Sequence, residues 1–298
     1  MKSALATLVC VAALTVGPAA ALAKSKPKAP ETPAVPQGPT GPVDADWRTP
    51  DPQNILVIDT SKGRILVELS PQAAPMHAQR VRDLARAGFY DGRSFFRVLD
   101  NFMDQTGDPK DDGTGSSDKP NLQPEFSFRR AADTPIAVVD KVGGLEWGFL
   151  GSLPVVSQTM DLGVLTADHK VNAWGAFCQG VVGAARAEDP ASANSQFFLM
   201  RGATHSLDKN YTAFGAVVSG LDVVRAIKLG APGTGKVDDP QDKMTKVQVL
   251  ADMPEAGRPK VRVLDPRGAW FRVLADRART QKVIEFGVCD VDLIADVK

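Results

Sequence analysis

A series of short apolar runs, each of strand length and separated from the next by turn residues, is the feature that most restricts the fold of this chain. Residues 55–60 and 64–69 flank Ser61-Lys62-Gly63, which predicts a β-hairpin. Similar runs occur at 94–99, 180–185, 195–200 and 212–218. Helical spacing of apolar residues is found from Pro75 to Gly88 and at 221–229. Many short strands with two helices predict an all-β barrel or sandwich.

The first 23 residues have the order expected of a signal peptide. Lys2 precedes an apolar run at 4–16 and the small-residue box Ala21-Leu22-Ala23. The run is shorter than the roughly 20 apolar residues that span a bilayer. Cys10 lies inside the run instead of just after it, so we expect it to leave with the signal at 1–23. We therefore expect an exported protein, periplasmic or secreted, without membrane insertion after cleavage.

The mature chain divides into three stretches. Residues 24–53 are dense in proline and nearly free of large apolar side chains, which predicts an extended linker. The regular region is expected at 54–253, with a surface loop at 101–119 and an ordered insertion at 129–177. The extension at 254–298 has strand-like runs at 260–264, 270–274 and 288–294.

Charge and residue spacing argue against several classes of ligand. Lys plus Arg and Asp plus Glu both number 35, so no net charge favours nucleic acid. The three histidines lack metal-ligand spacing, and we expect His77 on an exposed helix face. Asp108, Asp111 and Asp112 lack the alternation of a calcium loop, which favours a solvated turn. We predict no metal, no other cofactor and no nucleic-acid partner.

Two cysteines, Cys178 and Cys289, remain after signal cleavage. Disulfides form in exported proteins, but sequence alone does not give the distance between two sulfur atoms. A bridge and a pair of buried thiols therefore both stay open. A bridge would indicate that the extension wraps the barrel instead of forming a satellite domain.

Three ordered motifs carry a resemblance to a known family. They are Phe95-Phe96-Arg97-Val98-Leu99-Asp100-Asn101-Phe102-Met103-Asp104-Gln105-Thr106-Gly107-Asp108, Ser192-Ala193-Asn194-Ser195-Gln196-Phe197-Phe198-Leu199 and Leu207-Asp208-Lys209-Asn210-Tyr211-Thr212-Ala213-Phe214-Gly215. Together they resemble the cyclophilin signature, over roughly 55–253 apart from 129–177. The resemblance implies a closed eight-stranded antiparallel barrel with two flanking helices, carrying one large insertion and a C-terminal extension. It also implies peptidyl-prolyl cis–trans isomerase activity on proline-containing polypeptides.

The resemblance assigns roles that suit the reaction. Arg97 matches the catalytic arginine, and a permanently charged donor suits the prolyl nitrogen of a twisted amide. Gln105 and Gln196 match residues that hold the substrate backbone and orient the arginine. Other matches are the apolar pocket of Phe102, Met103, Phe198, Leu207 and Tyr211, the peptide-pairing edge of Ala185, Arg186 and Ala187, and Gly113 on the rim.

The sequence also departs from the family. Ser206 stands where well-known animal members have tryptophan, and Arg186 replaces the usual asparagine. Because the insertion enters just before the edge segment, we hypothesise that it forms a flap beside the groove. We expect a monomer, and an alternative to catalysis is a chaperone or scaffold that only binds proline-containing segments.

Overall fold

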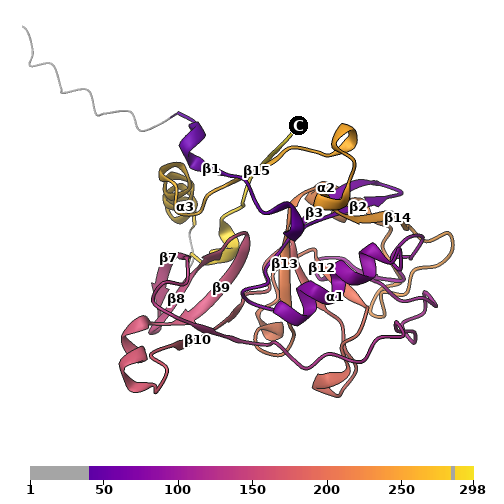
Figure 1. The fold of residues 1–298 in the computed structure, drawn as a ribbon, viewed down its shortest axis with the longest axis horizontal. Helices are drawn as coiled ribbons and strands as arrows, with labels where there is room; N and C mark the ends of the chain where they lie inside the picture. The colour runs from indigo at the N-terminus through magenta and orange to yellow at the C-terminus, as the bar shows by residue number, and fades with distance from the viewer. Residues whose placement is uncertain (1–39, 283–285) are drawn as a thin grey trace, which may run out of the picture. The chain divides into compact units, whose positions relative to one another are not determined.

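A curled antiparallel sheet of eight strands forms the centre of the fold in the computed structural model, which describes residues 40–282 and 286–298 (Figure 1). The expected signal peptide with Cys10, and the expected linker up to residue 39, lie outside the described residues. The strand order is β14-β2-β3-β13-β11-β12-β5-β4. The bounds are β2 (Ile55–Thr60), β3 (Gly63–Leu69), β4 (Arg97–Leu99), β5 (Met103–Thr106), β11 (Val181–Ala184), β12 (Phe197–Met200), β13 (Ala213–Ser219) and β14 (Met244–Val249).

The two edges of this sheet are joined. Ser94, before β4, forms an antiparallel bridge with Lys243, before β14, and the Phe95 N–H donates to the Asp242 carbonyl at 2.8 Å. Apolar side chains from alternate strand positions fill the interior. The prediction of an eight-stranded antiparallel barrel is confirmed, but β5 lies within the stretch that we expected to be a surface loop.

Both predicted helices are present. α1 (Pro75–Arg86) begins with proline, whose missing N–H leaves no hydrogen bond unmade in the first turn, and it buries Val81 and Leu84 against the barrel core. α2 (Leu221–Ala226) follows β13. The expectation of an exposed His77 is wrong. Its side chain is buried beside the ring of Phe214. Its Nδ1 lies 2.6 Å from Glu125 Oε2, which gives the buried ring a polar partner.

The insertion folds into a sheet of its own, with the order β6-β10-β9-β8-β7. Its apolar side chains pack on the outer surface of the barrel, in one cluster with Met103 and Phe198. The ordered excursion expected at 129–177 is thus a five-stranded sheet. Its bounds are β6 (Phe128–Arg130), β7 (Ile136–Val142), β8 (Leu145–Leu150), β9 (Leu153–Gln158) and β10 (Val171–Gly175).

The segment before the barrel corrects the expected linker, because residues 44–54 are ordered. β1 (Trp47–Arg48) pairs with β15 (Val261–Leu264), which pairs with β16 (Ala295–Val297). Asp46 Oδ1 accepts the Trp270 N–H at 3.0 Å, and Arg48 Nη2 donates to Glu68 Oε2 at 2.6 Å. Polar groups of this proline-rich segment therefore have fixed partners in the barrel and the extension.

The extension contains a third helix, α3 (Ala269–Gln281), and a short 3-10 turn, η8 (Val288–Asp290). The prediction of strands at 270–274 and 288–294 is wrong. Phe271 and Ala275 are spaced four apart and are both buried on one face of α3, where Phe271 meets Phe149 of the insertion edge-to-face at 5.3 Å. The strand at the end of the chain is β16.

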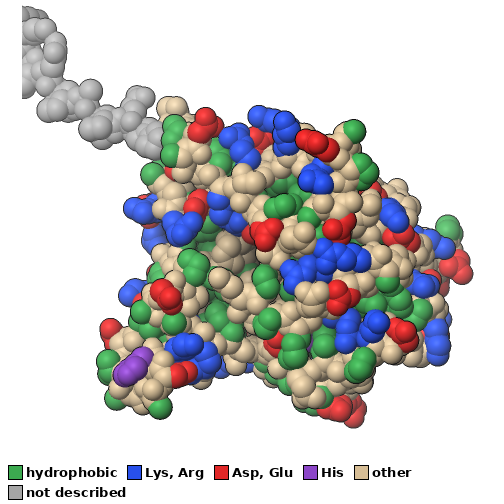
Figure 2. Space-filling model, viewed as in Figure 1, with side chains coloured by type: hydrophobic (Ala, Val, Ile, Leu, Met, Phe, Trp, Pro, Cys, Tyr) green, Lys and Arg blue, Asp and Glu red, His purple; other side chains and the backbone are tan. Residues whose placement is uncertain are grey.

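The surface charges and the lengths of the helices can be compared with the expectations from the sequence. On the face drawn in Figure 2, basic and acidic side chains are intermixed. Within the described residues, no helix combines the length and the apolar character needed to cross a bilayer.

Cys178 and Cys289 are bridged, which decides between the two possibilities left open by the sequence. Their Cα atoms are 5.0 Å apart, and 111 residues separate them along the chain. The bond joins the extension to the segment immediately before β11, so the extension wraps the barrel.

Removal of this disulfide should weaken the fold. Cys289→Ser should lower the free energy of unfolding by about 2–5 kcal/mol, because the unfolded chain regains a long loop. Denaturant titrations with and without dithiothreitol measure this. The reductant should destabilise the wild-type protein and leave the variant unchanged, whereas free thiols at Cys178 and Cys289 in denatured, unreduced wild-type protein would contradict the bridge.

Candidate functional site

Three of the predicted site residues form a row across adjacent strands. In the antiparallel registers, Arg97 on β4 lies opposite Gln105 on β5, and Gln105 lies opposite Phe198 on β12. Directly opposed residues share one face of a sheet, and residues two apart along a strand share it too. Met103 and Gln196 therefore join this row on the outer face of the barrel.

A relay of hydrogen bonds fixes the polar end of the row. Arg97 Nη1 donates to Gln105 Oε1 at 3.4 Å, and Gln105 Nε2 donates to Gln196 Oε1 at 3.0 Å. Gln196 Nε2 in turn donates to the carbonyls of Gly115 at 2.7 Å and Gly113 at 3.1 Å. The rim glycine Gly113 and both glutamines thus belong to one network.

Arg97 itself is half-buried and held from two sides. Its Nε donates to the Thr234 carbonyl at 3.0 Å, in addition to the contact of Nη1 with Gln105. Within the described part of the chain, no hydrogen bond engages Nη2. Burial lowers the pKa of Arg97 below its ordinary value, partly offset by Tyr211, but a guanidinium remains protonated in proteins. The group therefore offers a charged donor with a fixed direction.

The predicted apolar pocket is assembled beside this donor. Phe198 and Met103 are buried, while Phe102, Leu207 and Tyr211 are half-buried in the same cluster. Tyr211 meets Phe198 edge-to-face with ring centroids 5.9 Å apart. The result is a partly exposed aromatic and aliphatic surface next to Arg97.

Sequence reasoning missed two residues that support this pocket. Phe177 stacks beneath Phe198, with centroids 5.8 Å apart. Gly183 lies opposite Phe198 on β11, and a Cβ there would be 2.4 Å from Phe198 Cζ and 2.7 Å from Phe177 Cε1. A glycine inside an apolar strand often marks such a close approach, and this signal could have identified the position.

The edge segment borders a polar cavity of about 280 Å³. Ala185, Arg186, Ala187, Gly113, Gln105 and Gln196 all line this cavity. The Arg186 guanidinium lies 4.5 Å from the centroid of Tyr211 and donates to the Asn210 carbonyl at 3.0 Å. The N–H groups of Ala185 and Ala187 are already donated, to Gln196 O and Ser192 Oγ. Any substrate pairing by these two residues must therefore use their carbonyl groups.

The acidic loop has a structural role that corrects the expected solvated turn. Asp108 is fully buried, and its carboxylate accepts N–H groups from Lys110 at 2.8 Å and Gly113 at 2.5 Å. It thereby shapes the loop that carries the rim glycine. Across residues 40–282 and 286–298, no three His, Cys, Asp or Glu side chains gather as a metal site requires.

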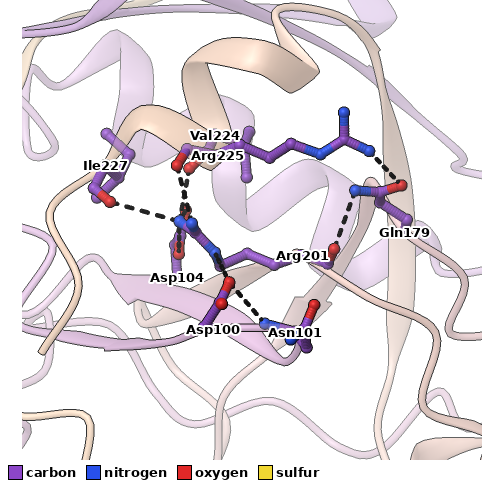
Figure 3. A network of polar contacts seen from close by, with 8 residues as sticks. All are labelled: Asp100, Asn101, Asp104, Gln179, Arg201, Val224, Arg225 and Ile227. Atoms are coloured by element: carbon purple, nitrogen blue, oxygen red, sulfur yellow. Dashed lines mark hydrogen bonds and ion pairs between the residues drawn. The ribbon is translucent and has the colours of Figure 1, made fainter. Parts of the chain in front are cut away.

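An ion pair supports the row from the inner face of the sheet (Figure 3). Asp104, between Met103 and Gln105, points inward and accepts from Arg201 Nη1 at 3.1 Å. Arg201 also donates to the carbonyls of Val224 at 2.9 Å and Arg225 at 2.8 Å, at the end of α2. Burial raises the pKa of Asp104 to about 7 even though Arg201 lowers it.

The insertion adjoins the site through its last strand. Trp174 of β10 lies under the Lys209 amine, which is 4.4 Å from the ring centroid. Lys209 belongs to the segment that carries Leu207 and Tyr211. The insertion is thus in contact with the site segment.

Comparisons with known proteins agree with this geometry. The family described as Cyclophilin type peptidyl-prolyl cis-trans isomerase/CLD matches residues 55–249. A probable peptidyl-prolyl cis-trans isomerase of Brucella suis is 33% identical over 214 residues, covering 68% of this chain and 85% of the relative. Cyclophilin AquaCyp293 from Hirschia baltica has a crystal structure similar to this one, with a TM-score of 0.76 and 31% identity. That likeness covers 84% of this chain and 93% of the other, which is more of the chain than the family match spans.

Asp104 predicts a pH dependence of stability. Its pKa is about 7 in the folded chain, against about 3.9 in an unfolded one. Between about pH 4 and pH 7 the folded state therefore keeps a proton that the unfolded state has released. The free energy of unfolding should fall as the pH rises through this window, by at most about 1.4 kcal/mol per pH unit from this group.

Comparison with Asp104→Asn isolates this contribution, because an amide does not titrate. Denaturant titrations at several pH values should show a shallower slope in the variant. Identical slopes for the two proteins between pH 4 and pH 7 would contradict the raised pKa.

Proposed function

The chain belongs to the cyclophilin-type peptidyl-prolyl cis–trans isomerases and has their activity, and we propose that Arg97 catalyses X-Pro rotation in exported polypeptides. The observation that carries this proposal is the row of Arg97, Gln105 and Phe198 on one face of three adjacent strands. It sets a charged donor, a polar backbone-binding group and an apolar surface side by side.

The reaction requires a donor that acts mainly in the transition state. Amide resonance gives X-Pro rotation a barrier of about 18–20 kcal/mol, and twisting the bond returns a lone pair to the prolyl nitrogen. A hydrogen bond to that nitrogen stabilises the twisted state more than either planar isomer. Arg97 is suited to this step, because Thr234 and Gln105 already fix the rest of its guanidinium.

Substrate binding follows from the neighbouring groups. Phe198, Met103, Leu207 and Tyr211 form the surface against which the proline ring packs, as aromatic and thioether groups suit a flat aliphatic ring. Gln105 and Gln196 hold the substrate backbone next to the cavity bordered by Ala185–Ala187. All these groups come from one chain, which supports action as a monomer. The reaction itself needs neither a metal nor another cofactor.

Export is proposed from two observations. The chain starts with a basic residue, an apolar run and a small-residue box, which is the pattern of a cleaved signal. The Cys178–Cys289 bond favours an oxidising compartment, where such bonds persist. The clients are then proline-containing polypeptides that fold in the periplasm or outside the cell.

Replacement of Arg97 tests the proposed chemistry. Arg97→Ala should lower kcat/KM for X-Pro isomerisation by about 100-fold or more, since it removes the transition-state donor. A protease-free assay by NMR exchange measures this, and circular dichroism confirms the fold. Arg97→Lys is the matched control, which keeps the charge but loses the planar fork and should recover only part of the activity.

Activity like wild type in Arg97→Ala would overturn the role of Arg97. If Arg97→Ala loses turnover but still suppresses aggregation of an unfolded protein, the groove also holds clients without catalysis. This outcome would identify a chaperone role that coexists with isomerisation.

The mature N-terminus tests the proposed export. When the full chain is expressed in a bacterial host with a periplasm, the recovered protein should begin at Lys24 and lie in the periplasmic or culture fraction. N-terminal sequencing and fractionation measure this. Recovery of an uncleaved chain from the cytoplasmic fraction would contradict the proposal.

A further inference from the structure

A cavity of about 360 Å³ lies where the insertion, the extension and the site segment meet. Its walls include Trp147 and Val142 from the insertion, Phe286 and Cys289 from the extension, and His205 from the site segment. Most of these side chains are apolar, and the indole Nε1 of Trp147 is buried without a hydrogen-bond partner in the described residues. The cavity is therefore built largely by parts of the chain outside the barrel.

His205 lies in the wall of this cavity with its side chain 49% exposed. It meets Trp147 edge-to-face with ring centroids 5.6 Å apart, and its Nε2 lies 3.7 Å from Cys289 Sγ. On its other side, Nδ1 lies 3.0 Å from Asp208 Oδ2. The second oxygen of Asp208 accepts the N–H of Phe177, the ring that stacks beneath Phe198. The wall of the cavity and the floor of the prolyl pocket are thus connected through one carboxylate.

The cavity is linked to the prolyl site by one short turn of the chain. The short turn η5 (His205–Leu207) places His205 at the cavity and Leu207 in the prolyl pocket. Ser206, between them, is exposed and small. Consecutive residues of an extended peptide are about 3.3–3.6 Å apart. A 3-10 turn rises about 2 Å per residue, so two or three residues of an extended client span the length of η5 from Leu207 to His205.

We propose that this cavity is a second client subsite, which takes a large apolar or aromatic side chain near the isomerised proline. The inference rests on the proposed function of the Arg97 groove. Trp147 supplies an aromatic wall, and Asp140 at the cavity disfavours an acidic side chain. Asp290 also lines the cavity, but it pairs with Lys282 at 2.6 Å. The occupant is thus a phenylalanine-like residue of the client, not an anionic one.

Peptide kinetics test the subsite. Two series of blocked peptides each contain one proline. In the first series Phe, Ala or Glu stands two positions before the proline, and in the second series it stands two positions after it. NMR exchange gives kcat/KM for each peptide. In one series, the wild-type protein should prefer Phe over Ala by about fivefold or more, as an apolar pocket allows, with Glu the poorest. Trp147→Ala should bring the Phe-to-Ala ratio close to one and leave the Ala peptide unchanged.

Two further variants control for the loss of a tryptophan elsewhere and for failure of Trp147→Ala to fold. Trp47→Ala removes a similarly half-buried tryptophan away from the cavity and should keep the preference. Val142→Glu adds a charge at a position that is 37% exposed, and it should abolish the preference even if Trp147→Ala does not fold. A Phe preference that survives Trp147→Ala or Val142→Glu, or no preference in either series, would overturn the subsite. Failure of the proposed function would give a different result from failure of the subsite, because Arg97→Ala would then retain turnover on every peptide.

Discussion

The alternation of side chains along β5 and β12 is the constraint on which the rest of the structure depends. Each strand has one face in the barrel core and one face in the groove. Asp104 points inward to Arg201, while its neighbour Gln105 points outward to the row of Arg97 and Phe198. A shift of one residue in this register would exchange the two sets of side chains. The buried contact between Asp104 and Arg201 favours the correct register, because the shift would remove Asp104 from Arg201 Nη1.

The outer face of these strands is also the base of a second apolar core. The insertion and the extension pack there, around Phe177 and Phe198, and the Cys178–Cys289 bond joins the extension next to Phe177. Gly183 allows both rings to lie close to the sheet. The parts of the chain outside the barrel therefore complete the surroundings of the prolyl pocket. The extension and the insertion are thus placed to influence the proposed site, although Arg97, Gln105 and Phe198 all belong to the barrel.

Much of the barrel and the site was predictable, because strand runs and ordered motifs are local in sequence. The errors arose where distant partners decide the structure. Trp47 pairs with Leu264 across more than 200 residues, so a proline-rich segment that looks like a linker is ordered. The apolar run at 270–274 favours a strand, but it is helical, and Phe271 and Ala275 have the four-residue spacing of a helix face. The disulfide depended on a distance that no sequence pattern encodes.

A crystal structure of the protein with a short proline-containing peptide bound tests most directly whether Arg97 acts on the prolyl nitrogen. The proline ring should lie against Phe198 and Met103, and the Arg97 guanidinium should be directed at the prolyl nitrogen. Gln105 should contact the peptide backbone. A peptide bound elsewhere on the barrel, or a proline ring in the groove with Arg97 turned away from the nitrogen, would contradict this role of Arg97.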